Sequence, residues 1–144
     1  MATATRSLLV AAPQAQVWEL IEDPHHMPRW WPGVVRMEGV EHDRFTQVFM
    51  TKKGRAVRID FQLLASEPPS RRAWAQEIEG TPFERVLGES IIEIALTPES
   101  GGTRVTIAQR QQLRGYSRTG GFLLKRATGD KLKEALEGIQ RALT

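Results

Sequence analysis

Between residues 34 and 113, hydrophobic side chains recur mainly at every second position, which is the period of a β-strand with one covered face. The stretch 55–65 shows this best, because Val57, Ile59 and Phe61 alternate with charged or polar residues. Clusters of Pro, Gly, Ser and Asp interrupt the alternation and are typical of turns. Because these connections are short, we expect consecutive antiparallel hairpins in a sheet with one face exposed to water. The pattern predicts six strands, at residues 34–41, 45–52, 55–66, 72–79, 85–97 and 103–113.

The start of the chain predicts a strand followed by a short helix. Residues 3–11 have the pattern of a strand, and residues 13–22 place their hydrophobic side chains largely on one helical stripe. Asp23-Pro24 ends this helix, since the residue before a proline is pushed out of the helical region. The proline-rich stretch that follows has room for only one or two short helical turns.

The end of the chain predicts a long helix. After Gly120-Gly121, leucines and an isoleucine recur at helical spacing over residues 122–143. Gly129 and Gly138 lie inside this stretch, where each glycine costs about 1 kcal/mol relative to alanine. We therefore expect a kink in this helix or a close approach to a neighbouring element. The helix should cover one face of the sheet.

Length and composition indicate one domain over residues 1–144. A chain of 144 residues with 40% hydrophobic side chains can bury a core without crosslinks. It has no cysteine, which excludes a disulfide framework, a thiolate nucleophile and a cysteine-ligated metal. No apolar run approaches the roughly 20 residues that cross a bilayer, and the first ten residues lack the pattern of a signal peptide. We expect a soluble, cytoplasmic protein without stable membrane insertion.

The net charge of +3 is concentrated at the C-terminal end. Residues 114–144 hold seven basic and three acidic side chains, whereas the rest of the chain is close to neutral. One explanation is a long amphipathic helix with a solvated basic face, and the other is attraction to an anionic ligand or surface. Few aromatic side chains accompany these charges, so we do not expect nucleic acid as a partner.

The order of these elements, together with one local motif, resembles the START-like (SRPBCC) superfamily and, within it, the polyketide cyclase/dehydrase and lipid-transport group. The resemblance covers essentially the whole chain and implies an α+β helix-grip fold. In that fold a curved antiparallel sheet of about seven strands wraps around a long C-terminal helix, with two short helices after the first strand. The motif reads Pro13-x4-Trp18-x-Leu20-Ile21-x-Asp23-Pro24, followed by Trp30-Trp31-Pro32-Gly33-Val34.

The resemblance also implies a hydrophobic pocket between the sheet and the long helix. A binding cavity is mostly apolar with a few fixed polar groups. Alternation along the strands and helical spacing select the side chains that should face it, and Trp74 is the best candidate among the tryptophans for its wall. The predicted lining residues are Trp31, Phe61, Leu63, Trp74, Gln76, Ile78, Ser90, Ile92, Ile107, Gln109, Gln111, Leu124 and Leu132.

This set is unusual in containing three glutamines at strand positions where the alternation would place apolar side chains. A buried amide without a partner costs about 1–3 kcal/mol, so each glutamine needs a neighbour, a water or a ligand. Gln76, Gln109 and Gln111 either lie on a half-exposed rim or anchor a ligand carbonyl or hydroxyl group.

The sequence offers only weak candidates for catalysis. His25 and His26 follow the first helix, where the family has its pocket entrance, and are either surface residues or proton carriers. With His42 they do not match a usual ligand spacing, so we expect no metal. We also expect no cofactor, because nucleophile elbows, phosphate loops and dinucleotide fingerprints are missing.

Three functions follow from this interpretation. The first is a non-catalytic protein that binds or carries a small hydrophobic molecule of lipid, isoprenoid or polyketide type. The second is a polyketide cyclase or dehydratase that uses the same cavity, positions its substrate through glutamines, and has His25 or His26 as proton carrier. The third is a protein-interaction module, which would need an exposed apolar patch. The sequence leaves open whether the protein is a monomer or a homodimer.

Overall fold

The computed structural model describes residues 2–115 and 118–144, and within these residues seven strands form one antiparallel sheet. The strands lie in the order β1-β7-β6-β5-β4-β3-β2, so each strand from β2 to β7 neighbours the next one along the chain. The meander predicted from the alternation is therefore confirmed. The strands are β1 (Ala2–Val10), β2 (Val34–Glu38), β3 (Arg44–Met50), β4 (Ala56–Glu67), β5 (Arg71–Gln76), β6 (Leu87–Glu99) and β7 (Gly102–Leu113).

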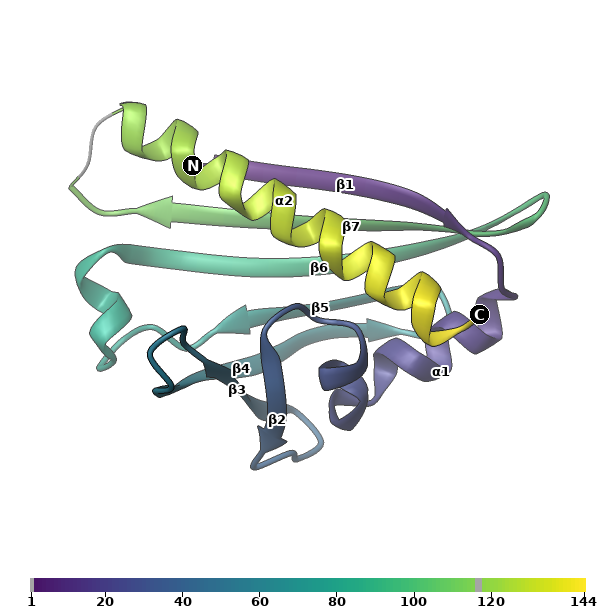
Figure 1. Ribbon diagram of the computed structural model, residues 1–144, viewed down its shortest axis with the longest axis horizontal. Coiled ribbons are helices and arrows are strands. Elements are labelled where there is room, and N and C mark those ends of the chain that lie inside the picture. Colours follow the sequence, from purple (N-terminus) through teal and green to yellow (C-terminus); the bar gives the residue numbers. More distant parts are fainter. Residues whose placement is uncertain (1, 116–117) are drawn as a thin grey trace.

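Two short helices follow the first strand, and one long helix crosses the sheet. The short helices are α1 (Gln14–Glu22) and the 3-10 helix η1 (Pro24–Arg29), which meet at Asp23. The long helix α2 (Arg118–Ala142) runs obliquely over one face of the sheet and ends near α1 (Figure 1). Together with the sheet, this arrangement is the helix-grip fold, as expected.

Several boundaries differ from the sequence prediction: β2 ends at Glu38 and not at residue 41, and β5 ends at Gln76 and not at residue 79. Two further differences concern α2 and β6. Helix α2 begins at Arg118, so Gly120-Gly121 lies in its first turns and is not its entry. The predicted strand at 85–97 begins only at Leu87, because Pro82–Arg85 forms a second 3-10 helix, η2. Proline fixes a helix-compatible φ at its start, and the Thr81 hydroxyl caps it by accepting a hydrogen bond from the Phe83 amide.

The two halves of α2 pack differently against the sheet. In the C-terminal half, Leu132, Leu136 and Ile139 are buried in the hydrophobic core. Near the N-terminal end, Phe122 and Leu123 are 66% and 58% exposed. The helix is therefore held against the core by its C-terminal half, and its N-terminal half leaves space above the sheet.

A close approach between Gly138 and the backbone of Trp30 holds the C-terminal half of α2 in place. A Cβ added to Gly138 would lie 2.9 Å from the Cα of Trp30, which is nearer than real Cβ atoms come to other heavy atoms. The expectation of a close approach is confirmed here, because only glycine lets the helix backbone lie this near to the end of η1. Gly129 differs, since an added Cβ would meet the guanidinium of the exposed Arg6, a side chain that can move aside.

Replacement of Gly138 should therefore destabilise the protein. We expect Gly138→Ala to lower the free energy of unfolding by about 1–3 kcal/mol, because the new methyl group displaces backbone rather than a flexible side chain. Gly129→Ala, in the same helix, is the matched control and should be neutral or stabilising by up to about 1 kcal/mol. Urea denaturation followed by circular dichroism measures both. Equal effects of the two substitutions would contradict the role given to Gly138.

Candidate functional site

A cavity of about 170 Å³ lies between the sheet and α2. Its walls come from β3, β4, β5, β6 and β7 on one side and from α2 on the other, and Trp31 after η1 and Phe83 of η2 complete the lining. Most of the lining is aromatic or aliphatic. The residues of this deep cavity are Trp31, Gln47, Phe49, Ile59, Phe61, Gln76, Phe83, Leu87, Ile92, Gln109, Gln111 and Lys131.

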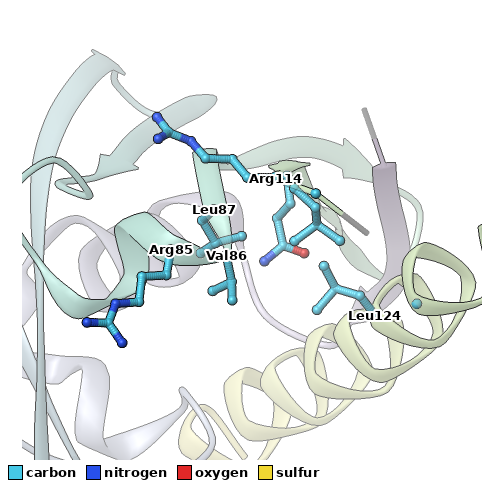
Figure 2. A pocket seen from close by; sticks show the side chains of 9 residues that line it. Arg85, Val86, Leu87, Arg114 and Leu124 are labelled. Carbon is cyan, nitrogen blue, oxygen red and sulfur yellow. The ribbon is translucent and has the colours of Figure 1, made fainter. Parts of the chain in front are cut away.

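A wider pocket of about 490 Å³ lies beside it, under the N-terminal part of α2. Leu87 and Gln111 line both spaces, so this outer pocket adjoins the deep cavity. Figure 2 shows Val86 and Leu87 on one side and Leu124 of α2 on the other, with the guanidinium groups of Arg85 and Arg114 directed away from the space between them. The entrance is therefore apolar, although arginines stand at its edge.

Four glutamine side chains bring hydrogen-bonding groups to the deep cavity. Gln109 donates a hydrogen bond to the Ser90 hydroxyl at 3.1 Å, and the Gln111 oxygen accepts one from the Thr128 hydroxyl at 3.0 Å. Gln47, which is 1% exposed, places its amide nitrogen 3.1 Å from the sulfur of Met27. These three amides are thus held by side chains of their own surroundings.

Gln76 is the exception. Its amide nitrogen is buried and has no hydrogen-bond partner among the described residues. Gln76 lies opposite Phe61 in the β4–β5 pairing, and both residues line the deep cavity. An unpaired buried donor costs about 1–3 kcal/mol, and a ligand oxygen in the cavity would remove this cost. Of the two roles predicted for the glutamines, the placement of Gln76 favours the ligand anchor.

Lys131 is the charged residue of the cavity wall in the part of the chain that the structure describes. Its ammonium nitrogen lies 5.6 Å from the centre of the Phe49 ring, within the range of a cation–π interaction. Burial lowers the pKa of the Lys131 ammonium below its ordinary value, and the negative charge of Glu134 opposes this effect only in part. The residue as a whole remains accessible to water, so its ammonium is partly and not fully desolvated.

About half of the residues predicted for the pocket line one of these two spaces. Trp31, Phe61, Gln76, Ile92, Gln109 and Gln111 line the deep cavity, and Leu124 lines the outer pocket. The remaining six do not line either space. They are Leu63, Trp74, Ile78, Ser90, Ile107 and Leu132.

Packing explains these corrections. Trp74 is fully buried because Phe45 covers it edge-on at 6.0 Å between ring centres, and Phe45 in turn stacks on Phe61. Leu63 is paired with Trp74 on the neighbouring strand and is half-buried. Ile107 and Leu132, both fully buried, fill the space where the C-terminal half of α2 meets the sheet.

The other two residues support the site from behind or lie beside it. Ser90 is 1% exposed and holds the amide of Gln109. Ile78 follows the end of β5 and is buried in the connection that leads to η2.

His25 and His26 lie outside both spaces. The His25 ring nitrogen Nδ1 lies 2.8 Å from the Asp23 carboxylate, and Nδ1 of His26 lies 3.1 Å from the carbonyl oxygen of Leu20. Burial alone raises the pKa of Asp23, but hydrogen bonds from the backbone and ring of His25, together with the charges of both histidines, leave this pKa below its ordinary value. The pair therefore belongs to the junction of α1 and η1, and its placement gives no support to a proton carrier in the cavity.

Sequence reasoning missed several lining residues. Gln47 and Phe49 lie on the same face of β3 as Phe45, so the alternation already predicted as a strand contained the signal for them. Lys131 is spaced three or four residues from Thr128 and Ala135, which are buried on the face of α2 toward the sheet. Its charge suggested the solvated face, but helical spacing places it on the inner one.

The described residues contain no group of three or more side chains suited to hold a metal ion. In the same part of the chain, no helix combines the length and the hydropathy that a membrane span requires. The groups that the described lining brings to the deep cavity are aromatic and aliphatic side chains, four amides and the Lys131 ammonium.

The whole sequence, residues 1–144, matches the family described as polyketide cyclase / dehydrase and lipid transport. The chain belongs to this family. The match confirms the resemblance inferred from the motif and the order of elements. A search of curated protein sequences finds no match.

Solved structures share the fold at low sequence identity. A START superfamily protein from Mycobacterium smegmatis has a TM-score of 0.78 at 9% identity, covering 99% of this chain and 97% of that one. The di-domain ARO/CYC BexL from the BE-7585A biosynthetic pathway has a TM-score of 0.80 at 23% identity, covering 98% of this chain and 46% of BexL. The di-domain ARO/CYC StfQ from the steffimycin pathway has a TM-score of 0.78 at 15% identity, covering 99% and 50%. This member of the family thus matches about half of each di-domain protein.

The unpaired amide of Gln76 gives a stability prediction for this family member. We expect Gln76→Met to raise the free energy of unfolding by about 1 kcal/mol, because it removes an unsatisfied buried donor and keeps the side-chain volume. Gln109→Met is the matched control and should lower it by about 1 kcal/mol, since the buried Ser90 hydroxyl loses its partner. Chemical denaturation of both variants measures the difference. A destabilised Gln76→Met protein would show that the amide is already satisfied.

Proposed function

We propose that this protein binds a small, mainly hydrophobic molecule that carries oxygen atoms, with its apolar part in the deep cavity and its path through the outer pocket. The observation that supports this most directly is the amide nitrogen of Gln76, which has no partner among the described residues and lies in a wall made mostly of aromatic and aliphatic side chains. Membership of the polyketide cyclase/dehydrase and lipid-transport family agrees with such a ligand.

The chemistry of the walls defines the kind of molecule. Apolar surface contributes about 25 cal/mol for each Å² removed from water, so aromatic and aliphatic walls favour rings or a chain. The Gln76 amide group would donate a hydrogen bond to a carbonyl or hydroxyl oxygen of this molecule. The deep cavity alone, at about 170 Å³, is smaller than typical ligand pockets of roughly 300–1,000 Å³. A ligand of lipid or polyketide size would therefore also occupy the outer pocket of about 490 Å³.

A second candidate function is catalysis of a cyclisation or dehydration in the same cavity. The observation that favours it is Lys131, a group in the wall that can stabilise negative charge on an oxygen atom. Against it, the described lining of the deep cavity contains no histidine and no carboxylate to transfer a proton. Binding without chemical change is therefore the function that these residues support better.

The interaction module has weaker support. Val86, Phe122 and Leu123 are exposed hydrophobic residues close to the outer pocket. These residues lie around the outer pocket, so they accompany a cavity and are not a flat apolar patch in place of one. The presence of a largely apolar cavity between the sheet and α2 favours a small molecule as the partner.

Blocking the passage between the two spaces tests the proposal. We expect the wild-type protein to bind the neutral fluorescent probe N-phenyl-1-naphthylamine. Leu87→Trp should bind it at least about tenfold more weakly, because Leu87 lines both spaces and the larger indole would occupy part of them. Leu124→Trp, which narrows the outer pocket from α2, should act in the same direction. Fluorescence titration measures the affinities.

Leu64→Trp is the control for this experiment, because Leu64 is 52% exposed on β4 and lines neither space. It should bind the probe like the wild type. Native mass spectrometry of the purified protein adds an independent readout, in which a retained lipid-like mass would support binding. A wild-type protein that retains no such mass and does not bind the probe would refute the proposal.

A further inference from the structure

Lys131 is an unusual residue for the wall of an apolar cavity. It projects from α2 on the face toward the sheet, and its ammonium lies over the ring of Phe49 on β3. The other described residues that line the deep cavity are aromatic, aliphatic or amide side chains. A single positive charge therefore stands at an otherwise uncharged wall.

No carboxylate neutralises this charge inside the cavity. Among the described residues, Lys131 forms no ion pair within 4.0 Å. Glu134, whose charge acts on Lys131, is in the same helix but lines a separate groove at the surface with Trp30 and Arg141. The partner that the ammonium has is the face of Phe49, which attracts a cation without cancelling its charge.

The position of Phe49 keeps the ammonium at the cavity wall. Gly33 has a φ of +82°, and a Cβ built on it would lie 3.2 Å from the Phe49 ring, so the ring rests directly against the backbone there. Phe49 therefore has the backbone of Gly33 close to its ring, and the Lys131 ammonium lies over that ring.

We infer that the ligand carries an acidic oxygen, either a carboxylate or an ionised phenol or enol, and that Lys131 selects it by charge while the apolar walls hold its rings or chain. This inference rests on the proposed function, because it concerns the same cavity. An anionic oxygen beside a partly desolvated ammonium gains a charge-assisted hydrogen bond, which is stronger than one between neutral groups. The amide of Gln76 would serve a second oxygen atom of the ligand.

A matched pair of probes isolates the charge. 2-Naphthoate and 2-naphthamide have nearly the same shape, but only the first is an anion at neutral pH. We expect the wild-type protein to bind 2-naphthoate about tenfold more tightly than the amide, as measured by isothermal titration calorimetry. 4-Nitrophenolate and 4-nitroanisole form the corresponding pair for an ionised phenol, read by absorbance. A preference in the first pair identifies a carboxylate, and a preference in the second identifies a phenol or enol.

Variants of Lys131 assign the preference to this residue. Lys131→Met should bring the affinity ratio within each preferred pair close to one, because it weakens the binding of the anion. Lys131→Arg should retain the ratio. Lys133→Met is the control, because it removes a lysine two residues away on the same helix that lines neither space, and it should also retain the ratio. Binding of N-phenyl-1-naphthylamine by each variant shows that its cavity is intact.

The outcomes separate this inference from the proposed function. If the wild type binds N-phenyl-1-naphthylamine but shows no preference for either anion, Lys131 has no selective role and the inference is wrong. A preference that persists in Lys131→Met would overturn it as well. If neither the neutral probes nor the anions bind to the wild-type protein, the proposed function fails, and the inference fails with it.

Discussion

The contact between Gly138 and the backbone of Trp30 is the constraint on which the rest of this structure depends. It brings the C-terminal half of α2 down onto the sheet, where Leu132 and Ile139 complete the core. The helix crosses the sheet obliquely (Figure 1), and its N-terminal half, where Phe122 and Leu123 are exposed, is not packed in the same way. The outer pocket lies under this N-terminal part and shares lining residues with the deep cavity, so the hollow part of the molecule lies next to the part that is tightly packed.

Pairing within the sheet determines which polar groups reach this space. Register places Gln109 opposite Ile92 and Gln111 opposite Ser90, so amides and apolar side chains share one face of β6 and β7. Ser90 and Thr128 then hold two of the amides from positions outside the cavity lining. Gln76 has no such neighbour, and Lys131 reaches the wall from the opposite layer. The polar groups left available to a ligand are therefore few and come from both the sheet and the helix.

Periodicity in the sequence was sufficient to predict the strands, because alternation with period two follows directly from one covered face of a sheet. It also identified inward-facing residues such as Trp74 and Phe61, which are both buried. It was not sufficient to tell packing from lining: Phe61 lines the deep cavity, whereas Trp74 packs against Phe45 and does not, and this depends on ring positions from three strands. Gly120-Gly121 misled for a local reason, since glycine disfavours a helix interior but tertiary contacts can override this preference. Lys131 was missed because its charge suggested solvent, while its position on α2 faced the sheet.

The pairing of β1 with β7 has a consequence for how the chain reaches its native state. Ala2 is paired with Gln111, and Val10 with Thr103, whereas the strands from β2 to β7 each pair with a strand next to them in the sequence. Contacts between residues so distant along the chain carry a large loop-closure cost and slow folding. Among the seven strands, β1 is synthesised first and its partner β7 last. The pairing of β1 can therefore begin only after Thr103 has been made, and it is complete only after Gln111 has been made.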